Sequence, residues 1–214
     1  MRHWGKDVMI TRRGLIVCAA GLVVAKAALA DLTVTPAQTA GPFYPQLKPD
    51  DSDMDLTRVR GSQGSAAGEV IEIQGRILSL KGHALGAAVV EIWQADIRGR
   101  YHHPGDRSVF SSPDPNFQGY GAVRTRADGG YRFRTVRPAA YRAGLLQRTP
   151  HIHFRVIDGG NRELVTQMYF PGEPLNAQDI IYSRLSGDLT RGAATARRGQ
   201  GGDVVRYEFD LVLA

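Results

Sequence analysis

The sequence contains a single cysteine, Cys18, among its 214 residues. The remainder of the chain can therefore form neither an internal disulfide nor a thiolate metal site, and any metal site must use nitrogen and oxygen donors. Internal repeats are also missing. Hydrophobic residues make up 43% of the chain and charged residues 22%, a composition typical of a globular protein with one sizeable core.

The sequence also lacks an apolar run long enough to remain in a membrane. The short run 15–25 follows the pair Arg12-Arg13 and precedes Ala28-Leu29-Ala30, a pattern that signal peptidases cleave. We interpret residues 1–30 as a twin-arginine export signal and expect a periplasmic or secreted protein with no membrane anchor after signal removal. The alternative is a general secretory signal that contains an arginine pair by chance.

A strong charge excess is absent once this signal is set aside. Residues 1–30 hold five of the 27 basic residues and one of the 21 acidic residues, so 22 basic and 20 acidic residues remain, a net charge of +2. No basic stripe with interleaved aromatic residues is visible. We therefore expect no nucleic-acid partner.

Residues 31–68 are rich in Pro, Asp, Ser and Gly and show little periodicity. We expect an extended N-terminal arm that lies over the core or over a partner subunit. Its distinctive motif is Gly41-Pro42-Phe43-Tyr44-Pro45, in which we assign Pro42 and Tyr44 to the edge of a substrate pocket. The alternative is that these aromatic residues only anchor the arm.

Alternating apolar and polar residues dominate residues 69–214, and Gly- and Pro-rich turns separate the runs. The pattern predicts an all-β fold, a β-sandwich of mostly antiparallel strands with long functional loops. The turn 127–130 predicts a hairpin, and a short helix within 177–185 is expected to be followed by loop up to residue 202. The expected strands cover residues 70–77, 89–94, 120–126, 131–135, 151–156, 163–170 and 204–213.

Histidine and apolar residues alternate in His151-Ile152-His153-Phe154. Because successive side chains of a strand point to opposite faces, His151 and His153 share one face, with backbones about 7 Å apart, while Ile152, Phe154 and Val156 share the other. The two imidazoles are close enough to bind one metal ion. A structural or surface histidine pair would show the same pattern.

Two tyrosines lie in expected loops beside strand ends, Tyr101 in the long polar connection 95–118 and Tyr141 shortly before the histidine strand. A tyrosine has a pKa of about 10, so it binds as a phenolate only to a strong Lewis acid, of which Fe(III) is the best example. The alternative is that both tyrosines are rim residues and the histidines hold copper or zinc. His102 and His103 are interpreted as residues outside the ligand set.

Several motifs occur together and in a fixed order: Gly99-Arg100-Tyr101, Asp114-Pro115-Asn116-Phe117, Gly130-Tyr131-Arg132-Phe133-Arg134-Thr135, Arg148-x-Pro-His151-Ile152-His153-Phe154 and Thr166-Gln167-Met168-Tyr169-Phe170. From about Gly41 to the C-terminus the chain resembles the intradiol ring-cleavage dioxygenases, above all the iron-bearing subunit of protocatechuate 3,4-dioxygenase. The resemblance implies a β-sandwich enzyme with non-haem Fe(III). It also implies that the metal ligands are Tyr101, Tyr141, His151 and His153.

The resemblance further implies the reaction. A catechol-type substrate loses both hydroxyl protons on binding, Tyr141 takes up a proton as general base, and Arg148 stabilises charge that develops on the ring. Gln167 belongs to the pocket wall. O2 then opens the ring between the hydroxylated carbons and gives a muconate-type diacid that contains both oxygen atoms.

The chain departs from the family pattern in two ways. The interval from Tyr141 to His151 is short, and Arg142-Ala143-Gly144 stands where many relatives carry a bulky aromatic residue, which leaves the substrate size open. An export signal is unusual for enzymes of aromatic catabolism and favours an extracellular aromatic substrate.

The rival interpretation is an exported β-sandwich binding module that retains a metal site without dioxygenase activity. A homo-oligomer and an assembly with a second subunit type both stay open.

Overall fold

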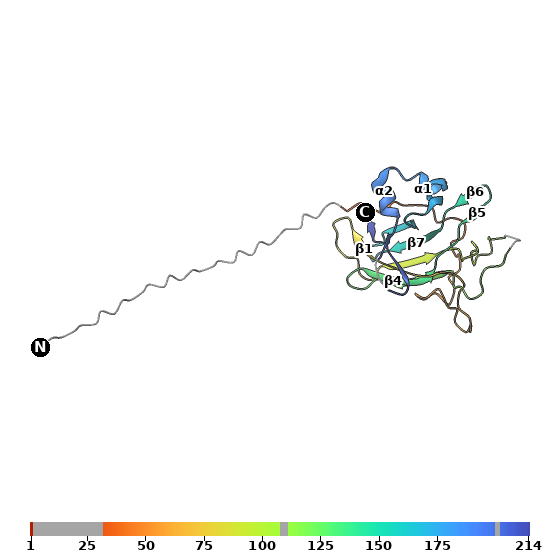
Figure 1. The fold of residues 1–214 in the computed structure, drawn as a ribbon, viewed down its shortest axis with the longest axis horizontal. Helices are drawn as coiled ribbons and strands as arrows, with labels where there is room; N and C mark the ends of the chain where they lie inside the picture. The colour runs from red at the N-terminus through yellow and green to blue at the C-terminus, as the bar shows by residue number, and fades with distance from the viewer. Residues whose placement is uncertain (2–31, 108–110, 200–201) are drawn as a thin grey trace.

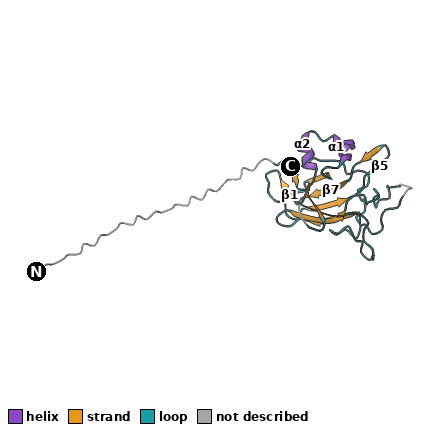
Figure 2. Cartoon of the chain, viewed as in Figure 1, coloured by secondary structure: helices purple, strands orange, loops and turns teal. Residues whose placement is uncertain are grey.

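The computed structural model describes residues 1, 32–107, 111–199 and 202–214, so residues 2–30 of the predicted export signal lie outside the described residues. Two β-sheets pack face to face, and the helices gather at one side of the body (Figure 1, Figure 2). Most strand pairs are antiparallel, and the predicted all-β sandwich is confirmed. No helix in the described part of the chain is long and apolar enough to cross a membrane.

The first sheet is built around β1 (Val70–Ser79), its longest strand. β1 pairs antiparallel with β4 (Gly130–Val136). It also pairs in parallel with β10 (Val205–Glu208) and β11 (Leu211–Leu213). The two-residue strand β9 (Arg197–Arg198) extends the sheet beyond β10.

The second sheet has the order β3-β2-β7-β8, and all its neighbours are antiparallel. A separate hairpin formed by β5 and β6 directly precedes β7. These elements are β2 (Val89–Trp93), β3 (Tyr120–Arg124), β5 (Tyr141–Ala143), β6 (Leu146–Arg148), β7 (His151–Ile157) and β8 (Glu163–Tyr169).

The core lies between the two sheets. Ile152, Phe154 and Val156 of β7 are fully buried in it, as the alternation predicts. Phe154 meets Phe209 and Tyr131 of the first sheet, with ring centroids 5.3 and 5.9 Å apart. Burying each large apolar side chain stabilises the fold by about 1.5–3 kcal/mol. Because the apolar side chains of β7 occupy the core, its histidines lie on the outer face of the second sheet.

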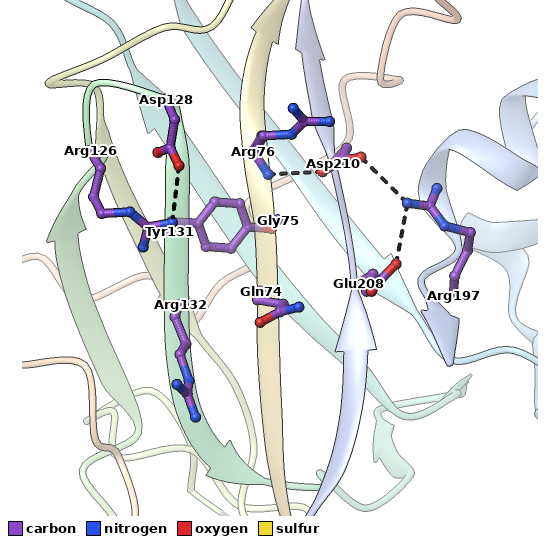
Figure 3. Close-up of a pocket in the computed structure, with 10 residues that line it drawn as sticks. All are labelled: Gln74, Gly75, Arg76, Arg126, Asp128, Tyr131, Arg132, Arg197, Glu208 and Asp210. Carbon is purple, nitrogen blue, oxygen red and sulfur yellow. Dashed lines mark hydrogen bonds and ion pairs between the residues drawn. The ribbon is translucent and has the colours of Figure 1, made fainter. Parts of the chain in front are cut away.

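The expected last strand is interrupted between β10 and β11. At this point the carbonyl oxygen of Phe209 approaches the backbone of Gly75 so closely that a Cβ on Gly75 would overlap it. The hydroxyl of Tyr131 donates a hydrogen bond to the same carbonyl. Figure 3 shows the Tyr131 ring beside Gly75. Only glycine permits this approach, so the break in the last strand depends on a residue of β1.

The turn at 127–130 is present, but the predicted hairpin is wrong. The flanking strands belong to different sheets, since β3 pairs with β2 and β4 pairs with β1. Gly129 adopts φ +75° in the turn, and its carbonyl accepts a hydrogen bond from Ile77 N at 2.9 Å. The turn residues specify a reversal of the chain, whereas the choice of neighbouring strand depends on the core.

The region after β8 is more helical than predicted. It contains the 3-10 helix η1 (Pro174–Gln178), α1 (Ile180–Ser183) and α2 (Gly187–Ala194), so the loop expected after residue 185 is wrong for α2. The α2 segment contains two glycines and carries little intrinsic helical preference. Tertiary packing holds it in place, because Ala194 is buried in a cluster with Tyr169 of β8.

The described residues before β1 form no helix and no strand. Thr35 N donates to Val212 O of the first sheet at 3.1 Å, and Gln38 N donates to Val165 O of the second sheet at 2.8 Å. Leu56, further along, is fully buried in the core. The arm is therefore hydrogen-bonded to both sheets before it reaches the outer face of β7.

Candidate metal centre

The four predicted ligand side chains converge on the outer face of the second sheet. The Nε2 atoms of His151 and His153 lie 3.2 Å apart although the ring centroids are 4.8 Å apart, so the rings approach through Nε2. The hydroxyl oxygens of Tyr101 and Tyr141 lie 3.4 Å apart, with ring centroids 5.4 Å apart. Tyr141 lies beside His151 and Tyr101 beside His153, at centroid distances of 5.7 and 6.4 Å. Residues far apart in the sequence thus form one cluster.

Strand register positions His153 between two side chains of neighbouring strands. Trp93 of β2 and Gln167 of β8 are its cross-strand partners. The Trp93 indole stacks on the imidazole, with centroids 4.8 Å apart and planes inclined by 8°. Trp93 and Gln167 are both almost completely buried, so His153 has little freedom to turn. The role of Trp93 is not predictable from the sequence, because cross-strand neighbours are known only once the register is known.

A turn after β2 presents Tyr101. Asp96 is fully buried, and its Oδ1 accepts hydrogen bonds from the backbone N–H groups of Arg98 and Arg100 at 2.7 and 2.9 Å. Asp106 accepts from Tyr101 N at 2.7 Å and pairs with Arg100 Nη1 at 2.8 Å. These carboxylates order this part of the loop and leave Tyr101 only 3% exposed.

Tyr141 is held by the β5–β6 hairpin, which the sequence analysis did not predict. In its register Tyr141 lies opposite Arg148. Gly144, at φ +61°, makes the tip, where Leu145 is fully exposed. The interval between Tyr141 and His151 is short because a compact hairpin fills most of it.

Burial keeps both histidines neutral. It lowers the pKa of His151 to about 3, and the positive charge of Arg148 acts in the same direction. The pKa of His153 also lies well below its ordinary value, first because of burial and then because of His151 and Arg148. His151 Nδ1 lies 2.6 Å from Thr149 O, and a carbonyl can only accept, so the proton of neutral His151 is on Nδ1. Its Nε2 presents a lone pair to the site, the form in which an imidazole binds a metal.

Burial has the opposite effect on the two phenols. It raises the pKa of Tyr101 well above the ordinary value, and the nearby Tyr141 adds to the shift. Burial also raises the pKa of Tyr141, although Arg148 opposes the change. The protein by itself does not create phenolates, so a strong Lewis acid is needed to remove the two protons.

The donor set fits a hard, highly charged metal ion. Two adjacent ligand atoms about 2.1 Å from an ion lie about 3.0–3.4 Å from each other, and the observed separations of the imidazole and phenol pairs are 3.2 and 3.4 Å. In the part of the chain that the structure describes, no group of three or more His, Cys, Asp or Glu side chains can hold a metal ion. A four-donor centre here requires the phenol oxygens. Two phenolates bring two negative charges, which favours a trivalent ion.

The arm covers the site from outside. A Cβ on Gly41, which adopts φ +66°, would lie 3.4 Å from His153 Cε1. Phe43 stacks on Tyr101, with ring centroids 4.6 Å apart and planes inclined by 30°. The arm therefore contacts one imidazole and one phenol of the cluster through two residues of its Gly41–Pro45 motif.

Tyr44 contacts Trp93 and Glu91 of β2. Its ring packs edge-on against Trp93 at 4.7 Å, and its hydroxyl donates to Glu91 Oε2 at 2.7 Å. The neighbouring Phe43, not Tyr44, touches a predicted ligand. The pocket-lining roles of Pro42 and Tyr44 stay predictions.

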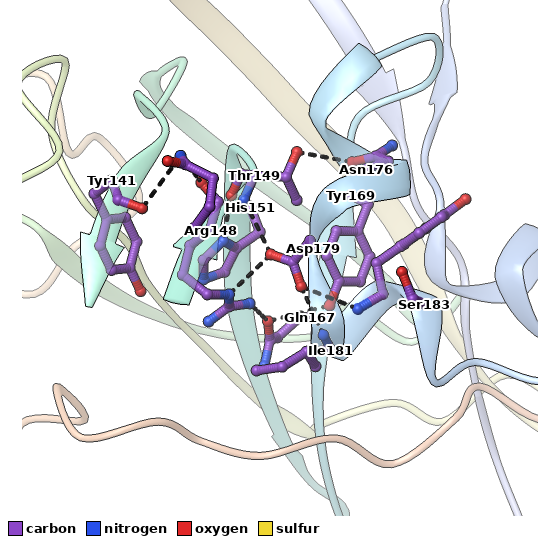
Figure 4. A network of polar contacts seen from close by, with 12 residues as sticks. Tyr141, Arg148, Thr149, His151, Gln167, Tyr169, Asn176, Asp179, Ile181 and Ser183 are labelled. Atoms are coloured by element: carbon purple, nitrogen blue, oxygen red, sulfur yellow. Dashed lines mark hydrogen bonds and ion pairs between the residues drawn. The ribbon is translucent and has the colours of Figure 1, made fainter. Parts of the chain in front are cut away.

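Arg148 and Gln167 are joined in a buried network (Figure 4). Arg148 Nη2 donates to Gln167 Oε1 at 2.5 Å, and Gln167 Nε2 donates to Thr39 O of the arm at 2.9 Å. Arg148 Nε forms an ion pair with Asp179 Oδ2 at 2.8 Å. Asp179 is not among the site residues predicted from the sequence. A signal was present, since an aspartate directly before a short apolar run is a typical helix N-cap.

His102 and His103 contact the backbone of their own loop. His102 Nε2 lies 2.8 Å from Asp114 O, and His103 Nδ1 accepts from Gly105 N at 2.9 Å. These nitrogens are engaged outside the four-donor cluster. The structure thus gives no reason to add either histidine to the ligand set.

A separate cleft of about 510 Å³ lies on the first sheet (Figure 3). Its side chains are mainly arginines and acids that pair with one another: Arg126 with Asp128 and Arg197 with Asp210, each at 3.4 Å. The cleft contains no imidazole. Its chemistry does not match that of the predicted site, which lies on the other sheet.

Comparisons with known proteins agree with this geometry. A family model described as "Dioxygenase" matches residues 39–214. The chain is 40% identical over 178 residues to the protocatechuate 3,4-dioxygenase beta chain of Burkholderia cepacia, covering 75% of this chain and 71% of that one. It is 30% identical over 167 residues to catechol 1,2-dioxygenase 2 of Acinetobacter lwoffii. That match covers 72% of this chain and 57% of the relative. The solved dioxygenase domain of a dioxygenase carbohydrate-binding protein fusion from Streptomyces sp. SirexAA-E is similar with a TM-score of 0.65 and 28% identity, over 85% of this chain and 98% of that one.

The chain belongs to the intradiol ring-cleavage dioxygenase family, whose members are oxidoreductases. The resemblance read from the sequence motifs is thereby confirmed. Enzymes of this family generally use non-haem iron. The match begins at residue 39 and so includes the arm motif as well as the four donors.

Proposed function

We propose that this protein cleaves the ring of a catechol-type aromatic compound between its two hydroxylated carbons, with both atoms of O2 entering a muconate-type diacid. The observation that carries this proposal is the convergence of two neutral imidazoles and two phenols on one sheet face, next to a buried arginine. The proposed cofactor is non-haem Fe(III), held by Tyr101, Tyr141, His151 and His153. When bound, it supplies the Lewis acidity that ionises phenols and catechols, and it makes the ring reactive toward O2.

Tyr141 is placed to move a proton. Of the two tyrosines it is the less buried, and it lies beside Arg148. Its hydroxyl oxygen takes up a proton from a substrate hydroxyl as general base. The Arg148 guanidinium stabilises negative charge on the ring, and the exclusion of water by the surrounding side chains strengthens this interaction.

The experiment is a visible spectrum of the purified, iron-reconstituted protein. A broad tyrosinate-to-iron charge-transfer band is expected, and catechol added without oxygen is expected to shift it. On admission of O2, a panel of catechols with different ring substituents is then assayed for oxygen uptake and diacid formation. A protein that stays colourless after iron reconstitution contradicts the proposed centre and leaves the copper or zinc alternative. A coloured protein that consumes no oxygen with any catechol is the binding module instead.

We also propose that the substrate is an aromatic compound met outside the cytoplasm. The support is the sequence of residues 1–30, in which Arg12-Arg13 precedes an apolar run and Ala28-Leu29-Ala30. Cell fractionation is expected to place the mature protein in the periplasm or medium. Replacing both arginines by lysine is expected to retain it in the cytoplasm. Export of the lysine variant through the general secretory route would contradict the twin-arginine assignment.

We propose that the chain works as an oligomer, formed either with copies of itself or with a second type of subunit. Relatives named as alpha and beta chains are subunits by name. Light scattering on the purified protein tests this, and a monomer with full activity would contradict it.

A further inference from the structure

The aspartate that begins α1 lies directly behind the candidate site. Asp179 is fully buried, and its carboxylate accepts four hydrogen bonds. Oδ1 accepts from the backbone N–H groups of Ile181 and Tyr182 at 2.8 and 3.1 Å and so caps the helix. Oδ2 accepts from Arg148 Nε at 2.8 Å and from Thr149 N at 3.0 Å (Figure 4). One carboxylate thus joins the helix to Arg148 at the end of β6 and to Thr149, just before the strand that carries His151 and His153.

These contacts fix Arg148 along two edges of its guanidinium. Nε is held by Asp179, and Nη2 donates to Gln167 Oε1 at 2.5 Å. Nη1 donates no hydrogen bond to any described residue. Figure 4 shows Arg148 between Tyr141 and Asp179. Because a guanidinium is planar and its donors form a rigid fork, two fixed donors determine the direction of the third.

Both members of the pair keep their charge despite burial. Burial alone would raise the pKa of Asp179, but the positive charge of Arg148 and the hydrogen bonds to the carboxylate together outweigh it and hold that pKa below its ordinary value. Burial likewise disfavours the charged form of Arg148, yet Tyr141 and Asp179 raise its pKa. The contact is therefore a buried ion pair, in which removing one partner leaves the other charge uncompensated.

We propose that Asp179 is a positioning residue for ring cleavage: its carboxylate holds the Arg148 guanidinium so that Nη1 faces the substrate ring. This inference rests on the proposed function, which gives Arg148 a substrate to face. Asp179 touches no reacting atom and acts through Arg148. The helical segment after β8, whose role the sequence does not indicate, thereby becomes part of the catalytic apparatus.

The chain offers a matched control in Glu173. Like Asp179, Glu173 caps a helical turn, since its Oε1 accepts from Leu175 N at 3.3 Å. It also pairs with an arginine, Arg137, at 2.8 Å. Arg137 lies over the ring of Phe170, in contact with the core and not with the metal cluster. Loss of either acid removes a cap and an ion pair, but only Asp179 reaches the site.

The test is a double-mutant cycle on the iron-loaded protein with Asp179→Asn, Arg148→Ala and the double variant. Asp179→Asn is expected to lower kcat by about 10- to 100-fold, the usual effect of removing a supporting contact, while the charge-transfer band and its shift with anaerobic catechol are retained. The double variant is expected to have the kcat of Arg148→Ala within about twofold, because Asp179 acts through that residue. Glu173→Gln is expected to lower thermal stability while kcat stays within about twofold of the wild type.

Three results would overturn the inference. The first is a folded, iron-loaded Asp179→Asn variant with wild-type kcat. The second is a double variant in which the two losses multiply, and the third is an equal loss of kcat in Glu173→Gln. If Asp179→Asn does not fold, Asp179→Ser retains an N-cap oxygen for α1 and loses the contact with Arg148, so it takes the same place in the cycle. If the wild-type protein turns over no catechol, both the proposed function and this inference are wrong. If the wild type is active and Asp179→Asn has the same kcat, only this inference is wrong.

Discussion

Tyr141 and Arg148 are cross-strand partners at the open end of the β5–β6 hairpin. The phenol that the proposed function treats as a base and the guanidinium that it treats as a charge stabiliser are therefore held by one short element. Arg148 also opposes the effect of burial on the pKa of Tyr141. A change in the hairpin therefore displaces both groups together. A short hairpin keeps the phenol and the guanidinium in a fixed relative position.

Tyr141→Phe removes one hydroxyl and keeps the ring that packs near Tyr101 and His151. Iron is expected to remain bound by the three other side chains, with a weaker charge-transfer band. Turnover is expected to fall by about 10²- to 10⁴-fold, the usual contribution of a general base. Tyr207→Phe is the control. The Tyr207 hydroxyl, on β10 of the first sheet, accepts a hydrogen bond from Arg137, and its removal is expected to leave kcat unchanged. A Tyr141→Phe variant with kcat within threefold of the wild type would show that another group accepts the proton.

Gly99 brings the Tyr101 loop against Tyr141. A Cβ on Gly99, at φ +72°, would lie 2.9 Å from Tyr141 Cβ, whereas a Cβ on Gly144, at φ +61°, would meet nothing within 4 Å. Alanine at either position costs about 1–2 kcal/mol for the left-handed backbone alone. Gly99→Ala is expected to cost more and to change the charge-transfer band, because it displaces Tyr141. Urea unfolding and visible spectra of the two variants measure the difference, and identical spectra would show that the close approach does not affect the metal centre.

The four candidate ligand side chains could be named from the sequence, because local signals single them out and the family resemblance groups them. Alternation in β7 places Ile152 and Phe154 in the core and so assigns His151 and His153 to the opposite face. Tyr101 and Tyr141 stand out because neither belongs to an apolar alternation. The β-sandwich fold brings these four side chains together, and the pattern of turns and strands also predicts that fold.

The supporting residues could not be predicted in the same way, because their contacts are long-range. Trp93 stacks on His153 only through the β2–β7 register, and Asp179 meets Arg148 from 31 residues further along the chain. The 127–130 turn shows that a local signal also does not determine which strands pair. Its local signal is strong, yet it connects two sheets, because burial of the flanking strands decides their partners.

Glu91 of β2 links the arm to the second sheet. Its Oε2 accepts hydrogen bonds from Tyr44 at 2.7 Å and Lys48 at 2.9 Å. Burial would raise the pKa of Glu91, but these hydrogen bonds outweigh it and lower the pKa. A carboxyl whose pKa is lower in the folded state stabilises the fold above its unfolded pKa of about 4.3, and this stability is lost as the pH falls through the folded value.

Glu91→Gln is therefore expected to lower the free energy of unfolding at pH 7 by about 1.5–3 kcal/mol, the worth of hydrogen bonds to a charged group. The gap to the wild type is expected to narrow as the pH falls below about 4.3. Asp188→Asn is the control, since Asp188 pairs with Arg191 at 3.8 Å on the surface, and such pairs contribute about 0–1 kcal/mol. Urea titrations at pH 7 and at lower pH measure both variants. A gap for Glu91→Gln that does not change with pH would contradict the ionised state of Glu91 in the fold.

Iron binding is expected to release one proton from each of the two phenols and none from the imidazoles. The reason is the state of the metal-free site: burial raises the pKa of Tyr101 and Tyr141, so both are phenols, and it lowers the pKa of His151 and His153, so both are already neutral. Titration of the metal-free protein with one ferric chelate in weakly buffered solution at pH 7 measures the release. Tyr101→Phe and Tyr141→Phe are each expected to release one proton fewer than the wild type, and because the iron source is the same, its own proton exchange cancels from the difference. Equal release by the wild type and Tyr141→Phe would mean that Tyr141 does not bind the metal as a phenolate, and the centre would then have only three protein ligands.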